Sequence, residues 1–269
     1  MEKNFFRLLC MSGFLFLVTA ANSQIQTVSQ KTTIGKKTMT WTTKSAKAKE
    51  LAGQGADHFM NIEFPQAYED FQAAIELDPD FTVALVFMAN LTTGETKKAF
   101  AERAIKSAGK KTEGEKLFAS SVALGITPEA NREIAAKLHD MFPDGSMLGL
   151  NYVFSRATPA EQFIAAGDYL KKFPDEACIY NVLAYLYIQE KKDTATAKTY
   201  FDKYLQMHPD GCNSYDSMGE YYFMVGDLEN SEKYYNKSLE KYPFNSSSID
   251  KLKEIKTIKE KNKTKSASN

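Results

Sequence analysis

The regular spacing of the prolines constrains the fold of this chain more than any other feature of its sequence. Pro79, Pro143, Pro174, Pro209 and Pro243 follow one another at intervals of 64, 31, 35 and 34 residues. The first interval is about twice the others, which indicates one further boundary of the same period without a proline. A period of about 20 to 50 residues is typical of repeat architectures, in which similar small units stack on one another. We therefore expect a repeat array over most of the chain.

The residues that precede these prolines also recur at fixed distances. In the last unit, Gly219, Ser231, Tyr235, Ser238 and Pro243 are separated by 12, 4, 3 and 5 residues. Two other units share this register: Gly55, Ala67, Phe71, Ala74 and Pro79, and, with one extra residue that we place in the turn 191–194, Ala184, Ala197, Phe201, Tyr204 and Pro209. Such spacing predicts two amphipathic helices that cross where the small residues meet, with the aromatic residue beside the crossing. The proline ends the second helix, because it cannot continue the hydrogen-bond ladder.

This pattern resembles the tetratricopeptide repeat family. The match is strong in three stretches, residues 48–79, 177–209 and 212–243. A second unit with similar spacing lies around Ala89, and two weaker helix pairs fill residues 112–174, where Asn131 and Gln162 stand in place of alanine. The resemblance implies an all-α fold, a right-handed superhelical solenoid of about six antiparallel helix pairs over residues 46–245.

The first 23 residues differ in character from the repeat array. Lys3 and Arg7 provide a positive start, an uncharged apolar run follows to Val18, and small residues come next. This is the three-part pattern of a secretory signal peptide. A membrane anchor is the alternative, but the run has about 11 residues and a span needs about 20. We therefore predict a signal peptide over residues 1–23 and an exported mature chain, soluble and periplasmic or secreted.

The segments that flank the array are also unlike the repeats. Residues 24–45 are rich in Thr, Gln and Lys, and we expect a flexible or extended leader, with a short strand over 38–43 as the alternative. Residues 246–262 are predicted to form a capping helix, since a repeat array needs a half-polar end. Its apolar stripe consists of Ile249, Leu252, Ile255 and Ile258. Residues 263–269 are polar and are expected to be disordered.

The charge balance argues against one class of partner. The chain has 34 basic and 34 acidic residues, and removal of Lys3, Arg7 and Glu2 with the signal peptide would leave 32 and 33. A near-neutral chain has no electrostatic footprint for nucleic acid. No other apolar stretch is long enough to span a bilayer, so we expect no membrane span in the mature chain.

The side chains that carry catalysis or bind metals show no recognisable spacing. His58, His139 and His208 have no His or Cys partner at ligand spacing, and the sequence contains no phosphate-binding loop or nucleophile elbow. Cys178 and Cys212 occupy nearly equivalent places in successive repeats, about 9–10 Å apart, whereas a disulfide needs Cα atoms within about 7 Å. Two free thiols are therefore favoured over a bridge. We predict no catalytic, cofactor-binding or metal-binding residues and no enzymatic activity.

The first helices of the pairs line the concave side of such a solenoid. Residues one turn around from the packing positions then face a groove. These groove candidates are Asn90 in the second unit, Asn181, Tyr185, Ile188 and Gln189 in the fifth, and Asn213, Asp216, Glu220, Phe223 and Met224 in the sixth. Aromatic and methionine side chains beside carboxylates suit an extended peptide or a partner helix. The alternative for Tyr185 and Phe223 is packing against the next repeat or the capping helix.

The sequence thus favours an extracytoplasmic interaction scaffold that binds a peptide segment or a partner helix in its concave groove. Some members of the family grip a terminal carboxylate with Lys, Arg and Asn. Here Asn181 and Asn213 are not accompanied by Lys or Arg, which argues against that clamp. A periplasmic glycan- or peptide-binding protein without catalysis is the alternative, since tyrosines stack on sugars, and a small-molecule ligand is the less favoured partner. An enzyme with an unrecognised site is the third reading.

Overall fold

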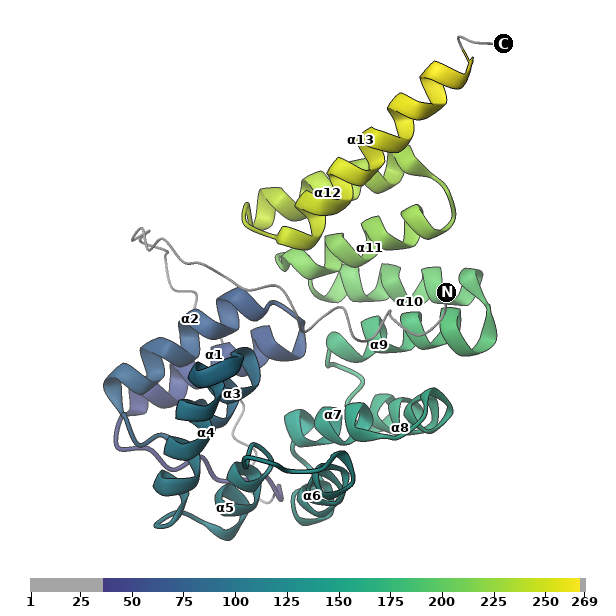
Figure 1. The fold of residues 1–269 in the computed structure, drawn as a ribbon. Coiled ribbons are helices and arrows are strands. Elements are labelled where there is room, and N and C mark those ends of the chain that lie inside the picture. Colours follow the sequence, from purple (N-terminus) through teal and green to yellow (C-terminus); the bar gives the residue numbers. More distant parts are fainter. Residues whose placement is uncertain (1–35, 267–269) are drawn as a thin grey trace. The chain divides into compact units, whose positions relative to one another are not determined.

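The structure of this chain is a computed structural model that describes residues 36–266. The predicted signal peptide and most of the predicted leader lie outside the described residues. Within residues 36–266 there are thirteen α-helices and no strand. They follow one another as six antiparallel pairs and a final helix (Figure 1). The all-α solenoid of helix pairs predicted from the sequence is confirmed.

The helix pairs divide into two groups by their packing. The pairs are α1 (Ala46–Met60) with α2 (Phe64–Leu77), α3 (Thr82–Leu91) with α4 (Gly94–Ala108), α5 (Glu113–Ser120) with α6 (Pro128–Met141), α7 (Ser146–Ser155) with α8 (Pro159–Lys172), α9 (Cys178–Leu186) with α10 (Thr194–Met207), and α11 (Cys212–Met224) with α12 (Leu228–Lys241). In the first, second, fifth and sixth pairs, the two helices pack mainly on each other. In the third and fourth, the contacts with neighbouring pairs match or exceed those within the pair. This difference follows the weaker repeat register of residues 112–174.

The predicted close crossing of two helices is present in the pairs with the strongest register. A Cβ atom on Gly55 would lie 3.1 Å from the ring of Phe71, and one on Gly219 would lie 2.8 Å from the ring of Tyr235. Phe71 and Tyr235 are fully buried, and truncation of a buried aromatic side chain to alanine costs about 3–5 kcal/mol. The small residue at each crossing therefore lets the second helix approach closely enough to bury its aromatic partner.

The extra residue of the fifth pair lies at a different place from the one predicted. The sequence register put it in the turn 191–194, but α9 continues into a π-helical turn, η2 (Tyr187–Lys191). In the sixth pair the N–H of Asp227 donates to the carbonyl of Tyr222, whereas in the fifth the N–H of Asp193 donates to the carbonyl of Tyr187, one residue further back. The wider helical turn absorbs the insertion, so α10 keeps the register of the other second helices.

The described part of the leader is an extended segment, residues 36–45, that forms no strand. It runs past the turn that precedes α7, the first turn of α5 and the turn that precedes α3. Its hydrogen bonds with these turns join Lys37 to Asp144, Thr42 to Glu115 and Thr43 to Asp78. Glu115 is fully buried, and it accepts both the N–H and the hydroxyl of Thr42, at 2.7 and 2.8 Å. The segment thus ties together the turns of successive repeats.

The last helix, α13 (Ser246–Ser266), closes the C-terminal end of the array. It continues past the predicted boundary at residue 262. Ile255, in the predicted apolar stripe, is fully buried. None of the helices in the described part of the chain has the length and hydrophobicity that crossing a membrane requires.

Candidate functional site

Three of the predicted groove residues on α11 are engaged by the end of the array. Asp216 accepts hydrogen bonds from two serines at the start of α13, and burial raises the pKa of Asp216 to about 6. Glu220 accepts a hydrogen bond from the hydroxyl of Tyr235 at 2.8 Å. The ammonium group of Lys251 lies 4.3 Å from the centre of the Phe223 ring. These three side chains therefore already form hydrogen bonds or ring contacts within the chain.

Two of the predicted groove residues on α9 are largely enclosed. Asn181 is only 2% exposed, and its Oδ1 atom has no hydrogen-bond partner within the described structure. Tyr185 is half-buried, and its ring meets that of Phe201 edge to face, with the centroids 5.0 Å apart. Burial, together with the charge of Glu220, raises the pKa of the Tyr185 hydroxyl group. Packing against the neighbouring helix thus accounts for part of the Tyr185 surface.

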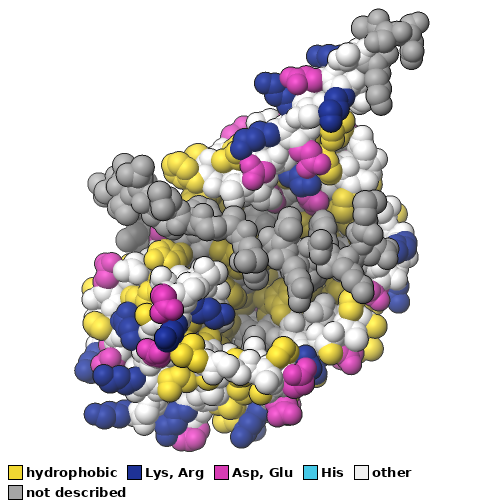
Figure 2. All heavy atoms as spheres, viewed as in Figure 1, with side chains coloured by type: hydrophobic (Ala, Val, Ile, Leu, Met, Phe, Trp, Pro, Cys, Tyr) yellow, Lys and Arg dark blue, Asp and Glu magenta, His cyan; other side chains and the backbone are white. Residues whose placement is uncertain are grey.

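The other candidates on α3, η2 and α11 keep accessible surface. Asn90 is exposed near the end of α3, and Met224 is 38% exposed at the end of α11. Ile188 and Gln189 are half-buried in η2, and π-helical turns occur frequently at functional sites. On the face of the molecule shown in Figure 2, acidic and basic side chains are interspersed. The accessible candidates therefore all lie toward the C-terminal ends of first helices.

Asn213, the remaining candidate, takes part in a contact between the first repeat and the fifth and sixth. Its backbone N–H donates to Glu63 Oε1 at 3.3 Å, and its side-chain amide donates to the Tyr204 hydroxyl at 3.1 Å. Tyr204 in turn donates to the carbonyl of Asn61 at 3.2 Å. His208 Nε2 lies 3.2 Å from Glu63 Oε1. We call this set of residues the junction: Asn61, Glu63, Tyr204, His208, Gly211 and Asn213.

Glu63 is the charged centre of the junction, and it is only 3% exposed. Burial alone would raise the pKa of its carboxyl group. The contact with His208, the charge of His58 and the N–H of Asn213 outweigh burial and lower the pKa below its ordinary value. The folded chain therefore stabilises the carboxylate form of Glu63 over the protonated acid.

Further titratable groups surround Glu63 on the first repeat. His58 Nδ1 lies 2.8 Å from Asp70 Oδ2, and this contact outweighs the opposing effect of burial and raises the pKa of His58. Burial, followed by the charge of Glu176, raises the pKa of Asp57 to about 6.

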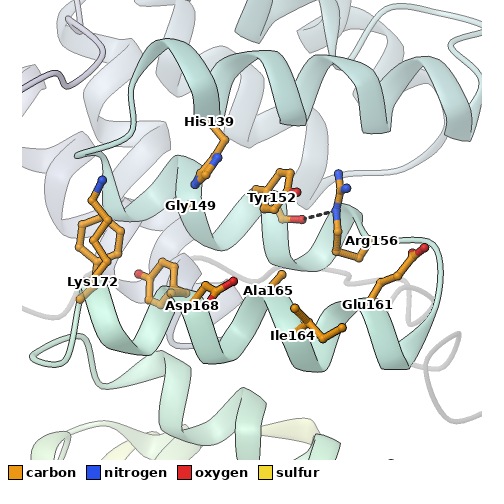
Figure 3. Close-up of a pocket in the computed structure, with 11 residues that line it drawn as sticks. His139, Gly149, Tyr152, Arg156, Glu161, Ile164, Ala165, Asp168 and Lys172 are labelled. Atoms are coloured by element: carbon orange, nitrogen blue, oxygen red, sulfur yellow. Dashed lines mark hydrogen bonds between the residues drawn. The ribbon is translucent and has the colours of Figure 1, made fainter.

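A cavity of about 470 Å³ lies between α6, α7 and α8 (Figure 3). The ring of His139 stacks on that of Tyr152 at 4.5 Å, and the guanidinium of Arg156 lies 3.9 Å from the centre of the same ring. Arg156 Nε also donates to the carbonyl of Tyr152 at 3.3 Å. Across the cavity, α8 contributes Asp168 and Ile164, of which Ile164 is 68% exposed. The cavity thus combines an oriented cation with aromatic and apolar surface.

The cysteines are poorly suited to nucleophilic chemistry. Cys178 and Cys212 are both buried free thiols. Burial raises the pKa of each thiol to about 12, so the reactive thiolate is scarce at neutral pH. Over the described residues, no group of three or more His, Cys, Asp or Glu side chains is placed to hold a metal ion.

The fifth helix pair agrees with a known repeat family. Residues 179–210 match the tetratricopeptide repeat. The chain therefore contains a tetratricopeptide repeat over its fifth helix pair. Among solved structures it is similar to a tetratricopeptide repeat protein from Parabacteroides merdae ATCC 43184, with 15% identity, a TM-score of 0.50, and coverage of 77% of this chain and 83% of that one. At this identity the likeness concerns the fold alone.

Two other solved structures are similar at lower scores. PilW, described as a widely conserved type IV pilus biogenesis factor, shares 13% identity at a TM-score of 0.46, with 77% of this chain and 99% of that chain covered. The Cut9–Hcn1 hetero-tetramer of APC/C gives 15% identity and a TM-score of 0.48, with 78% and 43% covered. These two scores are too low to support a conclusion. No curated protein matches this chain in sequence.

Sequence reasoning predicted neither the cavity nor the junction. The hydrogen bond from Asn213 to Glu63 joins residues 150 positions apart, and the repeat period relates only units that follow one another. One signal of the junction was nevertheless in the sequence. The turn inside the pair reads Gly226-Asp227 in the sixth repeat but Ile62-Glu63 in the first.

Proposed function

We propose that this tetratricopeptide-repeat protein is a protein-interaction scaffold without catalytic activity. It binds a peptide segment or a partner helix on its groove side. The observation that carries the proposal is the array of six helix pairs, which leaves accessible side chains at the ends of its first helices. Stacked helix pairs form extended binding surfaces.

The proposed contact surface spans the C-terminal ends of α9 and α11. It consists of Ile188 and Gln189 in η2, the accessible part of Tyr185, and Met224. Asn90, on the second repeat, is a further accessible candidate. Methionine adapts its shape to different partners, and apolar side chains at repeating intervals receive the apolar face of a helix or alternate side chains of an extended peptide.

We also propose that the scaffold acts outside the cytoplasm. The signal-peptide pattern of residues 1–23 supports this location. The mass of the chain purified from the cell envelope or the medium tests it, and we expect a mature chain that begins at residue 24 or shortly before. An intact chain from Met1 that is confined to the cytoplasm would contradict export.

A photoreactive amino acid at Gln189 or at Met224 tests the contact surface in the cells that express the chain. We expect the same cross-linked protein from both positions, since they belong to consecutive repeats. Lys203 is the control, because it is exposed but lies on α10, the second helix of the fifth pair. Adducts that are as abundant from Lys203, or no adduct from either test position, would show that the groove side is not the binding surface.

A ligand-binding protein without catalysis is the second candidate function, and the cavity on the fourth pair favours it. In the described structure Arg156 has no carboxylate partner within ion-pair distance, and Tyr152 holds its guanidinium in place. Thermal unfolding with a panel of short glycans and acidic peptides tests this function. A stabilisation that Arg156→Gln removes would support a ligand in the cavity, and unchanged unfolding across the panel would argue against it.

A further inference from the structure

Three of the turns inside helix pairs have a left-handed residue directly before the N-cap of the second helix. In each, the residue before the second helix adopts a left-handed conformation: Ile62 (φ +63°), Lys192 (φ +54°) and Gly226 (φ +81°). The next residue is the N-cap of the second helix: Glu63, Asp193 and Asp227, respectively. Because the left-handed residue and the N-cap are equivalent positions in the three turns, the side chains at these two positions can be compared.

The turn of the first repeat departs from two local rules that the others respect better. Glycine adopts a positive φ without steric cost, whereas a β-branched residue such as Ile62 is a genuine outlier there. Asp193 and Asp227 each cap their helix by accepting a backbone N–H, at 2.9 and 3.0 Å. The side chain of Glu63 makes no capping hydrogen bond with α2. Both departures fall on adjacent residues of one turn.

The carboxylate of Glu63 binds a distant loop instead of its own helix. Its Oε1 atom accepts the N–H of Asn213 and faces His208 Nε2. Asn213 is the second residue of α11, and the N–H groups at a helix N-terminus favour an anion. Gly211 makes room for this contact, because a Cβ there would overlap the His208 ring and lie 2.5 Å from Glu63 Oε1. The loop 208–213 therefore forms a receptor for one carboxylate.

Several polar atoms buried around the contact between Glu63 and the loop 208–213 lack hydrogen-bond partners, which is unusual for a permanent buried contact. Asn61 Oδ1 and Gln66 Oε1, on either side of Glu63, are buried without hydrogen-bond partners in the described structure. His208 Nε2 is close to Glu63 but lacks the geometry of a hydrogen bond. Unsatisfied buried polar atoms weaken a contact. Strained backbone such as that of Ile62 occurs preferentially at ligand clamps and switch regions.

We propose that the loop 208–213 is a binding site for a carboxylate on a segment of a partner protein, and that Glu63 occupies this site as an internal competitor until the segment displaces it. The ligand class is a peptide with Asp or Glu between apolar residues, which is the pattern that Ile62, Glu63 and Phe64 provide within the chain. Displacement would uncover Tyr204 and Asn213. The existence of a partner segment rests on the proposed function, whereas the occupancy by Glu63 does not.

The probe for this site is a fluorescent peptide with the sequence of residues 59–66, titrated against the full chain. The internal Glu63 competes at an effective concentration of about millimolar. We therefore expect Glu63→Ala to bind the probe at least about tenfold more tightly than the wild type. A probe with Gln in place of its Glu should lose about tenfold or more, because charge-assisted hydrogen bonds are the stronger ones.

Matched variants separate the site from a general loss of stability. Asp227→Ala removes the N-cap at the equivalent turn, and it should bind the probe as the wild type does. His208→Ala added to Glu63→Ala should weaken binding of the probe. Glu63→Gln preserves volume and replaces Glu63→Ala if that variant does not fold. Equal affinity of the wild type and a folded Glu63 variant, or indifference to the Glu-to-Gln change in the probe, overturns the proposal.

Hydrogen exchange at the backbone N–H of Asn213 reports the occupancy by Glu63 without any partner. In the full chain we expect exchange at least about tenfold faster in Glu63→Gln than in the wild type, because the acceptor loses its charge. Asp227→Ala should leave this exchange unchanged. If Glu63→Gln also leaves it unchanged, the internal competitor does not exist. Cross-linking from Gln189 and Met224 does not depend on this result, so the two proposals fail separately.

Discussion

The turn between α1 and α2 resembles the turn between α11 and α12 in its backbone, since each has a left-handed residue before an N-cap. The side chains of the two turns make different contacts. In the sixth repeat, Gly226 adopts its positive φ freely and Asp227 caps α12, so the turn is satisfied locally. In the first repeat, Ile62 adopts a positive φ without the freedom of glycine, and Glu63 does not cap α2. A left-handed conformation costs a non-glycine residue about 1–2 kcal/mol, and a missing N-cap costs about 1 kcal/mol.

This difference shows where the array is specialised. Natural sequences usually keep local preference and global fold in agreement, and departures are expected at functional or strained sites. The first turn departs from local preference at the place where its side chain reaches His208 and Asn213. The contacts of the junction thus stand in place of the favourable φ and the N-cap that the equivalent turn of the sixth repeat has.

Of the changes that distinguish the two turns, Gly211→Ala should lower the free energy of unfolding the most. It would displace His208 and Glu63, and overpacking of this kind costs about 1–3 kcal/mol. Gly226→Ala is the matched change in the locally satisfied turn, where a Cβ meets nothing within 4 Å. It should cost only the left-handed strain, about 1 kcal/mol. Denaturant unfolding measures both, and a smaller loss for Gly211→Ala than for Gly226→Ala would mean that the junction adds little stability.

Relief of the strain at Ile62 should have the next largest effect. Asparagine tolerates the left-handed conformation, so Ile62→Asn should stabilise the chain by up to about 1 kcal/mol. Lys192→Asn at the equivalent position should gain less, since lysine is not β-branched. A rise in melting temperature for Ile62→Asn is the expected result. A fall would show that the half-buried Ile62 side chain contributes more by packing than its backbone costs.

The stability of the junction and the stability of the contact between α11 and α13 should depend on pH in opposite directions. The folded chain lowers the pKa of Glu63, so its stabilisation is complete above the ordinary value of 4.5 and is lost as the pH falls through the lower folded pKa. Asp216 is the opposite case, because its pKa rises from 3.8 to about 6. Its contribution is most favourable in acid and weakens as the pH rises through that interval.

Hydrogen exchange at Asn213 and at the first turn of α13 measures these two contributions when it is expressed at each pH as a protection factor, which removes the intrinsic pH dependence of amide exchange. Glu63→Gln should remove the pH dependence at Asn213, and Asp216→Asn should remove the dependence at α13. A common pH profile at both places, unchanged by either variant, would show that the whole chain titrates as one unit.

Glu63→Asp should have the smallest effect on stability, and it distinguishes capping of α2 from the contact with Asn213. Aspartate gives the first turn the N-cap residue of the other two, a gain of about 1 kcal/mol. The shorter side chain withdraws the carboxylate from Asn213, a loss of about 1 kcal/mol for a hydrogen bond. Net stability should therefore change little, while the exchange of the Asn213 N–H accelerates. Slow exchange in this variant would mean that aspartate still reaches the loop.

The repeat fold was predictable because it depends on neighbours in the sequence. The spacing from Gly219 to Tyr235 fixes which faces of two consecutive helices meet, and the structure places them in contact. The π-helical turn was not predictable from spacing, because an inserted residue can widen a helix or lengthen a loop while the register on both sides stays the same. Only the hydrogen bond from Asp193 to Tyr187 distinguishes these two solutions.

The site was less predictable than the fold for a related reason. Helical spacing shows on which side of its helix a residue such as Asp216 or Asn213 lies. It does not show what covers that side. Serines of α13 engage Asp216, and Glu63 of the first repeat engages Asn213. The unusual residues of the α1–α2 turn were the available signal, because they contradict the local preference of the equivalent turns.

The extended segment 36–45 has a mechanical consequence. Its hydrogen bonds at Asp144, Glu115 and Asp78 follow one another along the segment. A pull from the N-terminal side would therefore break them in succession, beginning with the bond between Lys37 and Asp144. Force would reach α1 only after Thr43 and Lys44 had both left Asp78. We therefore expect the segment to detach one hydrogen bond at a time before a pulling force unfolds the first repeat.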